Sequence, residues 1–400
     1  MDTIEQNSQK ALLELEQSIS SAAASYSNVH RGAGYCSEIT TQLYEKAKGI
    51  VLDFLNLNAK KYCVIFCTPE HSRRLRQKLK NEDYKIITSC EICLPVGLHA
   101  LAIKTKAVPR GVPILKGGST VKIVSSHSVM WADAPQKLEA GTPSAINAIA
   151  FAAALQICKK YKINSLKYIQ QSDFLTFDLL HNDSLARYHG QELYIKVKNQ
   201  LRGRALKVPV ETGENSFTSL DNAASTPALL PVLDAALKAL RILPSRSPEI
   251  IGEVKKILSD FFEIDLEKFE IIFTGNTTEA VNIAAQFIQA EYEQTSNLVI
   301  LSSELEHNSN ELPWRFIPGA TLIRLPVDKE GFISHSELEE VLKNYNTEKK
   351  YGEKRIRVVA ISGASNVLGT FNNIEAISKI THKYNSRLFV DGAQLTAHRS

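Results

Sequence analysis

The sequence has no long apolar run and no strong charge of either sign. Its 400 residues include 47 lysines and arginines against 43 aspartates and glutamates, a formal net charge of +4. No basic run is interleaved with aromatic residues, so the composition predicts no nucleic-acid partner. The longest apolar stretch, around residues 148–157, is too short to cross a bilayer, and we expect no membrane partner.

Cysteine is missing from the second half, since the last of the six cysteines is Cys158. Cys90 and Cys93 have the spacing of a zinc knuckle, which Cys63 and Cys67 could complete. The alternative is that Cys63 and Cys67 lie in a buried strand, where free cysteine behaves as a small apolar residue. We favour this alternative and expect no metal. The polar, acidic N-terminus resembles neither a signal nor a transit peptide, so we expect a cytoplasmic protein.

Helical and extended patterns alternate along the chain, and the length suggests two or three domains. In the first half we predict helices at residues 1–25, from the glycine-rich loop to about 57, at 73–80 (strongly basic) and at 143–160, with strands at 62–67 and 121–125. The polar stretch from about 168 to 215 reads as a connector.

The second half has the clearer pattern. It predicts helices at residues 228–240, 247–262, 277–292, 336–345 and 373–384, and strands at 269–274, 298–302, 321–325, 357–362 and 387–390. This alternation is typical of an α/β fold, in which helices cover a mostly parallel sheet.

Polar side chains follow the apolar strands of the second half. Thr277 or Thr278 can cap a helix start, where free N–H groups and two hydroxyls would suit a phosphate. The same motif is also an ordinary helix start, so alone it is a weak signal. Four other polar residues follow strand ends in the same predicted sheet: His307, in a loop, Asn366, Asp391 and Gln394. Because the ligand crevice of an open parallel sheet lies beyond these ends, we expect one shared site.

Five segments of the second half resemble, in order and spacing, the class V, fold-type I pyridoxal-phosphate enzymes, which include cysteine desulfurases, selenocysteine lyases and aminotransferases. They are Leu220-Asp-Asn-Ala-Ala-Ser-Thr-Pro227, Gly275-Asn-Thr-Thr-Glu279, Glu306-His-Asn-Ser-Asn310, Ser365-Asn-Val-Leu-Gly369 and Val390-Asp-Gly-Ala-Gln394. The resemblance implies a three-layer large domain, incomplete at its C-terminal end, that binds pyridoxal 5'-phosphate and acts on a small amino-acid substrate.

The same resemblance implies a role for each residue of the site. Thr277 and Thr278 would hold the cofactor phosphate, and His307 would stack on the pyridine ring. Asp391 would pair with the protonated ring nitrogen. The phenolic oxygen would be bonded by Gln394, with Asn366 near that oxygen or near the substrate carboxylate.

The first half carries a weaker resemblance to the same family. The matching segments are Ser27-Asn-Val-His30-Arg31-Gly-Ala-Gly34, Lys116-Gly117-Gly118-Ser-Thr120, Trp131-Ala-Asp133-Ala-Pro and Glu139-Ala-Gly141-Thr-Pro143. Residues 1–200 therefore resemble a degenerate α+β copy without the cofactor-binding core, joined by a linker at 201–216 to the large domain at 217–400. We expect an intramolecular pseudo-dimer or a homo-oligomer, in which His30, Arg31, Gly117, Gly118 and Thr120 reach the cofactor site across the domain interface.

One family feature has no counterpart here. The Schiff-base lysine of these enzymes lies in a Ser-x-His-Lys segment beyond the aspartate, and no lysine follows Lys383. We therefore expect weak cofactor retention and an inactive chain, as the N-terminal part of a longer enzyme or a truncated gene product. The sequence does not distinguish a desulfurase from an aminotransferase or another lyase. The rival hypothesis is a non-catalytic pseudoenzyme that binds a partner, for which the basic helix at 73–80 would be suited.

Overall fold

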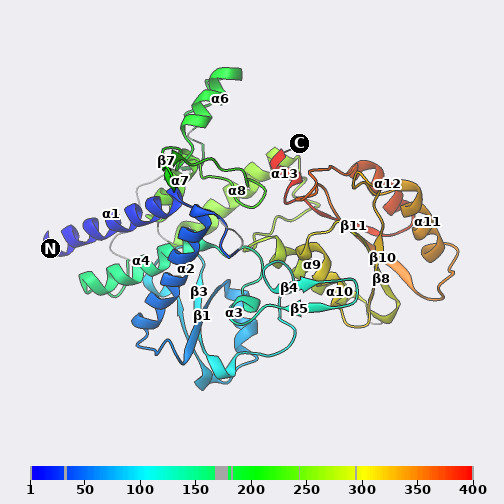
Figure 1. Ribbon diagram of the computed structural model, residues 1–400, viewed down its shortest axis with the longest axis horizontal. Helices are drawn as coiled ribbons and strands as arrows, with labels where there is room; N and C mark the ends of the chain where they lie inside the picture. The colour runs from blue at the N-terminus through cyan, green and yellow to red at the C-terminus, as the bar shows by residue number, and fades with distance from the viewer. Residues whose placement is uncertain are drawn as a thin grey trace. The chain divides into compact units, whose positions relative to one another are not determined.

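The computed structural model describes residues 2–30, 34–166, 179–181, 183–242, 244–292 and 295–398. The chain divides into two compact units (Figure 1). The first unit is Met1–Pro109 with Pro143–Phe273, and the second unit is Arg110–Thr142 with Thr274–Ser400. The segment Arg110–Thr142 thus packs with the second half of the sequence. The predicted domains at 1–200 and 217–400 rest on resemblance and not on packing, and they stay a prediction.

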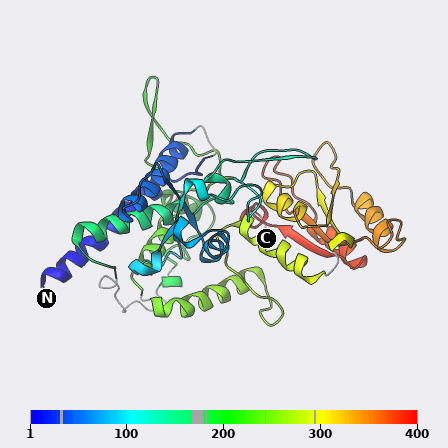
Figure 2. The same ribbon diagram turned by 90° about the horizontal axis from the view of Figure 1, so that it is seen from below.

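Three long helices form the core of the first unit. They are α1 (Asp2–Ala24), α2 (Tyr35–Phe54) and α4 (Ala145–Tyr161), and all three were predicted. Their apolar faces meet in one cluster in which Leu15, Val51 and Phe151 are almost fully buried. Figure 2 shows these helices, in blue and teal, alongside one another. Burial of such apolar stripes is what stabilises helices of this length.

A small antiparallel sheet packs against these helices. Its order is β1 (Tyr62–Cys67), β3 (His99–Lys104), β2 (Tyr84–Thr88), of which only β1 was predicted. The basic helix α3 (Pro69–Arg76) begins and ends four residues earlier than predicted, because Thr68 caps it and Pro69 starts it. The Glu70 carboxylate accepts hydrogen bonds from Arg73 and Arg74, so part of the positive charge is neutralised within the helix.

The remaining helices and strands that the structure describes in the first unit are three α-helices and one hairpin. It contains α6 (Gly190–Asn199), the hairpin β6 (Lys207–Val210) and β7 (Gly213–Ser216), α7 (Leu230–Ala239) and α8 (Ser247–Phe262). The predicted connector falls partly on residues 167–178 and 182, which lie outside the described residues. The predicted strand at 269–274 is wrong: none of the four sheets in the described ranges includes this segment. An apolar segment of this kind forms a strand only beside a hydrogen-bonding neighbour.

The second unit has three layers around a parallel sheet, as predicted. The strand order is β11 (Arg387–Asp391), β10 (Arg355–Ser362), β8 (Leu298–Ser303), β9 (Thr321–Leu325), and every neighbouring pair is parallel. Helices α9 (Thr277–Glu291) and α10 (Asn308–Arg315) cover one face, while α11 (His335–Asn346) and α12 (Ile374–Lys383) cover the other (Figure 1). β8 is buried along its whole length, as the central strand of such a sandwich must be.

Two smaller elements complete the second unit. The segment from the first half forms the hairpin β4 (Val121–Val124) and β5 (Val129–Trp131), and the short helix α13 (Leu395–His398) follows β11. Among the helices that the structure describes, none combines the length and apolar composition of a bilayer-spanning segment.

Exposed apolar residues in α8 and after it predict self-association. Phe261, Phe269 and Ile272 are 74%, 64% and 66% exposed. Exposed large apolar side chains promote contact between molecules. We expect the chain to sediment as concentration-dependent oligomers, and the double substitution Phe269→Ser and Ile272→Ser to shift it towards the monomer. Phe332→Ser, at an exposed position of the second unit, is the control that should not. A wild-type chain that stays monomeric at every concentration would contradict this prediction.

Candidate functional site

The carboxyl ends of three neighbouring parallel strands gather the polar residues predicted from the sequence. His307 follows β8, Asn366 follows β10, and β11 ends in Asp391, three residues before Gln394. Asp391 is 7% exposed and pairs in register with Ser362 of β10. His307 and Gln394 are half-buried, and Asn366 is exposed. Parallel strands place all these ends at one edge of the sheet.

Helix α9 begins at Thr277, as predicted, but its capping residue differs from the prediction. Asn276, not Thr277 or Thr278, is the N-cap, and its Oδ1 accepts the backbone N–H of Glu279 at 3.0 Å. The Glu279 carboxylate in turn accepts the N–H of Gly275 at 2.8 Å. Asparagine is at least as good a cap as threonine, so capping by Asn276 is favourable. It leaves Thr277 exposed in the first turn, where the backbone N–H groups have no acceptor within the helix.

A buried hydroxyl pair joins the start of α9 to the start of α10. Thr278 Oγ1 lies 2.6 Å from Ser309 Oγ, and both residues are more than nine-tenths buried. The Ser309 N–H donates to Nδ1 of His307 at 3.2 Å. His307, in the loop after β8 as predicted, is therefore the N-cap of α10. The pair fixes the imidazole beside the first turn of α9.

Glu306 is a functional candidate that the sequence reasoning missed. Its carboxylate accepts hydrogen bonds from Ser303 Oγ at 2.6 Å, Ser362 Oγ at 2.7 Å and Asn310 Nδ2 at 2.7 Å. It thereby ties the ends of β8 and β10 to α10. Burial raises the pKa of the Glu306 carboxyl, while these hydrogen bonds act in the opposite direction. The available signal was an acidic side chain between an apolar strand and the histidine.

The segment Arg110–Thr142 is fastened to α9 through its backbone. Asn282 of α9 receives the N–H of Lys116 at 3.1 Å and donates to the carbonyl of Lys116 at 2.7 Å. The next residue, Gly117, has φ +144°, and a Cβ there would lie 2.5 Å from Thr278 Cγ2. Only glycine allows the backbone to approach Thr278 so closely.

The remaining predicted glycine-loop residues stabilise this approach. Thr120 is fully buried, and its hydroxyl bonds the N–H and the carbonyl of Gly117. The carbonyl of Gly118 accepts the N–H of Gly141 at 2.8 Å. A Cβ at Gly141, where φ is +78°, would lie 2.5 Å from the side chain of Asn276, the α9 cap. The loop and the helix start therefore form one packed assembly.

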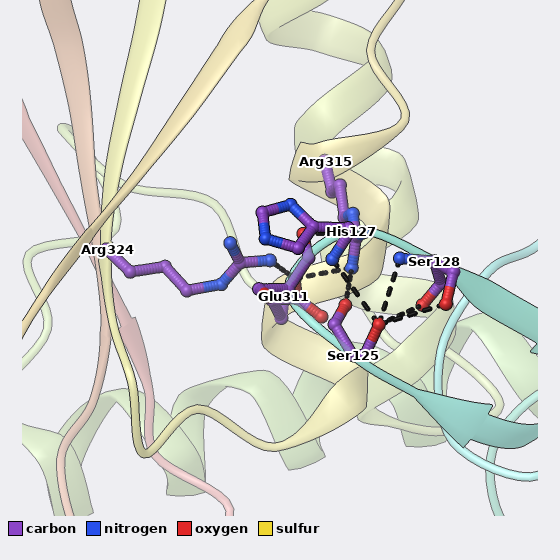
Figure 3. Close-up of polar contacts among 7 residues, drawn as sticks. Ser125, His127, Ser128, Glu311, Arg315 and Arg324 are labelled. Carbon is purple, nitrogen blue, oxygen red and sulfur yellow. Dashed lines mark hydrogen bonds and ion pairs between the residues drawn. The ribbon is translucent and has the colours of Figure 1, made fainter.

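The hairpin of the same segment is held at its tip (Figure 3). Arg315 of α10 donates to the carbonyls of Ser125 at 2.8 Å and Ser126 at 3.0 Å. The buried carboxylate of Glu311 pairs with Arg315 and with Arg324 of β9, which orients the Arg315 guanidinium. Trp131 also packs on Phe316, with ring centroids 5.3 Å apart.

The other two predicted residues from the first half lie elsewhere in the chain. His30 belongs to the first unit, where its Nε2 is 3.3 Å from Glu45 Oε1. Arg31 lies outside the described residues. Their contribution to the site stays a prediction.

Two chemical capabilities follow from this geometry. The first turn of α9, with free N–H groups, the exposed Thr277 hydroxyl and the backbone of Gly117 close by, suits an anion such as a phosphate. At the end of β11, Asp391 is buried, and one of its carboxylate oxygens accepts a hydrogen bond from the N–H of Ala393 at 3.0 Å. A buried carboxylate with its second oxygen available suits a cationic ring nitrogen.

A family model described as aminotransferase class V matches residues 83–216 and 218–400. The chain belongs to this family. Members of the class V aminotransferase family use pyridoxal phosphate, and the parallel three-layer sheet of the second unit is their fold-type I arrangement. The matches on both sides of residue 217 include the segment Arg110–Thr142 and the whole carboxyl edge of the sheet.

The relatives are named as cysteine desulfurases. The chain is 31% identical over 202 residues to a probable cysteine desulfurase of Halalkalibacterium halodurans, covering 47% of each protein. A probable cysteine desulfurase of Borreliella burgdorferi is 36% identical over 152 residues, 37% of this chain and 33% of that protein. The apo cysteine desulfurase structure from Thermococcus onnurineus has 27% identity and a TM-score of 0.38, with 44% of each chain covered. The chain therefore spans half or less of the length of these relatives.

The cysteines lie away from the carboxyl edge of the parallel sheet in sequence. Cys63 and Cys67 are on β1, as predicted, and their thiols donate to the carbonyls of Ile103 and His99 of β3. Within the described ranges, no three His, Cys, Asp or Glu side chains gather as a set that could ligate a metal ion.

The hydrogen bonds of Glu306 predict that one substitution at this position destabilises the fold and another does not. Trp314 Nε1 donates to Asn310 Oδ1, so Asn310 must present its NH2 group to Glu306. In Glu306→Gln, the side-chain oxygen can accept hydrogen bonds from Asn310 and Ser362, and the nitrogen can donate to Ser303. Glu306→Leu leaves buried donors without an acceptor, and each such donor lowers the free energy of unfolding by about 1–3 kcal/mol. We expect Glu306→Leu to destabilise the second unit and Glu306→Gln not to.

A comparison of wild type with Glu306→Gln tests the raised pKa of the Glu306 carboxyl. The folded state holds this proton more tightly than the unfolded state, so the contribution is present below the ordinary glutamate pKa of about 4.3 and is lost as pH rises. As pH rises, the free energy of unfolding of wild type should fall relative to that of Glu306→Gln. The loss is about 1.4 kcal/mol for each tenfold difference in proton affinity between the folded and unfolded states. Urea unfolding followed by tryptophan fluorescence measures this, because Trp131 and Trp314 both lie in the second unit. Parallel pH profiles would contradict the prediction.

Gly141 and Gly111 provide a matched test of the loop packing. Both have similar positive φ, +78° and +82°, but nothing lies within 4 Å of a Cβ at Gly111. Alanine at either position carries a backbone strain of about 1–2 kcal/mol. Gly141→Ala also displaces the Asn276 cap, so its free energy of unfolding should be lower by about a further 1 kcal/mol. If urea unfolding shows equal losses of unfolding free energy in the two variants, Gly141 does not support the Asn276 cap.

Proposed function

We propose that this chain forms the cofactor-binding part of a pyridoxal-phosphate enzyme that acts on an amino acid. One observation carries the proposal: a continuous path of contacts crosses the carboxyl edge of the sheet. It runs from Thr278 through Ser309 to His307, and the adjacent Glu306 continues it to Ser362, which pairs with Asp391. The residues assigned to the phosphate, the ring face and the ring nitrogen thus belong to one connected structure.

The start of α9 would hold the cofactor phosphate. Thr277 offers an exposed hydroxyl, and the first N–H groups and the helix dipole favour negative charge. Thr278 is buried against Ser309, so its hydroxyl orients the turn, and its N–H is one of the first-turn donors that have no acceptor within the helix. The close backbone of Gly117 would exclude water from one side of the phosphate.

The strand ends would orient the ring. Asp391 would pair its carboxylate with the protonated ring nitrogen, and His307, fixed by its bond to Ser309, would lie on the ring face. Gln394 and Asn366 would bond the phenolic oxygen and the substrate side of the ring. When bound, pyridoxal phosphate takes up the electron pair released at the substrate α-carbon, and the protein supplies orientation and charge.

The first half would complete this site as a degenerate second copy of the family. The match of the family model to residues 83–216 supports a family-related segment in the first half. We place the degenerate copy at residues 1–200 and the large domain at 217–400, joined at 201–216. The contacts of Lys116 and Gly117 with α9 support an intramolecular pseudo-dimer in which one copy serves the site of the other. His30 and Arg31 would be further contributions of that copy. Further association into homo-oligomers is compatible with this arrangement.

The reaction class follows from the relatives and from what the chain contains. The relatives' names suggest a desulfurase, but the residues after Cys158 include no cysteine that could act as the sulfur acceptor. No Ser-x-His-Lys segment is present either, so we propose that this chain alone holds the cofactor reversibly and is inactive. We place the complete protein in the cytoplasm.

Cofactor affinity tests this proposal through Asp391. Asp391→Asn keeps the shape and the acceptor for Ala393 but removes the charge. A hydrogen bond to a charged group contributes about 1.5–3 kcal/mol, so affinity for pyridoxal phosphate should fall roughly 10- to 100-fold. Equilibrium dialysis of the full chain measures it, with the exposed Asp260→Asn as the control for loss of one charge. Equal affinity in wild type and Asp391→Asn would refute the assignment.

A further inference from the structure

The segment that contains the hairpin β4–β5 is attached near both ends of helix α10. At the start of α10, a Cβ on Gly117 would lie 3.2 Å from the Cα of Ser309, so the loop before the hairpin touches the first turn. At the end of α10, Arg315 donates to the carbonyls of Ser125 and Ser126 in the hairpin tip (Figure 3). All these residues belong to the second unit. Loop and tip are thus held at opposite ends of a helix of eight residues, which is about 12 Å long.

The hairpin needs support from outside itself. An isolated pair of strands is marginally stable at best, and β4 and β5 form a sheet of only two strands in the part of the chain that the structure describes. The end of α10 supplies this support twice. Arg315 bonds the tip, and Phe316, the C-cap of α10, packs on Trp131 of β5. The order of the hairpin therefore depends on how α10 presents Arg315.

Glu311 fixes the direction of the Arg315 guanidinium. The two residues lie one helical turn apart, and their side chains are only 8% and 15% exposed, with Oε1 and Nη1 3.4 Å from each other. A free arginine side chain has many rotamers, so a buried carboxylate at its base restricts it to the geometry that reaches the tip. Among the described residues, the Glu311 carboxylate bonds only Arg315 and Arg324. Any effect of Glu311 on the hairpin therefore passes through Arg315.

The hairpin is joined in turn to the glycine loop. The N–H of Ala132, which follows β5, donates to the carbonyl of Thr120 at 2.8 Å and closes the base of the hairpin. The Thr120 hydroxyl donates to the carbonyl of Gly117 at 2.7 Å and accepts its N–H at 3.2 Å. Gly117 packs on Thr278 in the first turn of α9. A continuous path of contacts thus leads from Arg315 to the proposed phosphate site.

We propose that Glu311 and Arg315 are positioning residues for the cofactor phosphate. They hold the hairpin tip, and the ordered hairpin keeps Gly117 against the first turn of α9. Without this support the loop would leave its packed position for part of the time, and the affinity for the phosphate would fall in proportion to the packed fraction. The inference rests on the proposed function and assigns part of its binding affinity to two residues that do not touch the phosphate.

Hydrogen exchange of the full chain without cofactor tests the path of contacts. In Arg315→Met, which removes both bonds to the tip, the amides of Gly117 and Thr120 should lose most of their protection. Glu311→Gln should act in the same direction and should add little to Arg315→Met, because Glu311 acts through Arg315. Arg324→Met is the matched control: it removes an ion pair of Glu311 but no contact with the hairpin, so these amides should exchange as in wild type.

Wild-type exchange of the two amides in Arg315→Met would overturn the proposal. If Arg315→Met does not fold, Glu311→Gln, which keeps the size and shape of the side chain, decides the same question. Loss of protection in Arg324→Met to the same extent would also overturn it, because the effect would then follow the stability of the unit and not the hairpin contact.

Affinity for the cofactor tests the link to the phosphate. In equilibrium dialysis, Arg315→Met and Glu311→Gln should bind pyridoxal phosphate about 2- to 30-fold more weakly than wild type, the range for residues that act along a path of contacts. Arg324→Met should bind it as wild type does. Pyridoxal, which lacks the phosphate, should keep its affinity in Arg315→Met but lose affinity in Asp391→Asn.

The two ligands separate this inference from the proposed function. Equal affinity for pyridoxal phosphate in wild type and Arg315→Met, or equal losses for pyridoxal and pyridoxal phosphate in that variant, would overturn the inference alone. A wild-type chain that binds no pyridoxal phosphate would refute the proposed function, and the inference with it.

Discussion

The hydrogen bond between the buried hydroxyls of Thr278 and Ser309 holds the first turns of α9 and α10 together. Much of the second unit's site depends on this contact. It fixes the helix that presents N–H groups to an anion, and it places Ser309 where its own N–H orients His307. Gly117 packs directly on Thr278, so the segment Arg110–Thr142 from the first half of the chain also packs against this pair of helix starts.

Glu306 plays the corresponding part between the strands. A buried carboxylate is unfavourable in isolation, and here three donors from two strand ends and a helix compensate for its burial. The network aligns the end of β8 with the end of β10, and the register of β10 with β11 then positions Asp391. Order at the carboxyl edge thus comes from side-chain hydrogen bonds as well as from the sheet.

The sequence was most informative where local pattern and tertiary environment agree. The strands predicted at 298–302, 321–325 and 357–362 are rich in apolar residues, and β8, β9 and β10 lie in the sheet at these positions. The segment at 269–274 has the same pattern without a neighbouring strand, so propensity alone misled. Helix α10 was missed because Pro313 and a run of polar residues interrupt its pattern, while the burial of Trp314 that stabilises it is a tertiary effect. Glu306 went unnoticed because its three donors come from separate elements, which no local spacing reveals.

The central claim is that the start of α9 and the end of β11 hold the two ends of one cofactor molecule. A crystal structure of the full chain grown with pyridoxal phosphate tests it most directly. The account predicts electron density with the phosphate at the first turn of α9 beside Thr277 and Gly117, and the ring nitrogen facing Asp391. Cofactor density at any other place, or a phosphate at α9 with the ring turned away from Asp391, would contradict it.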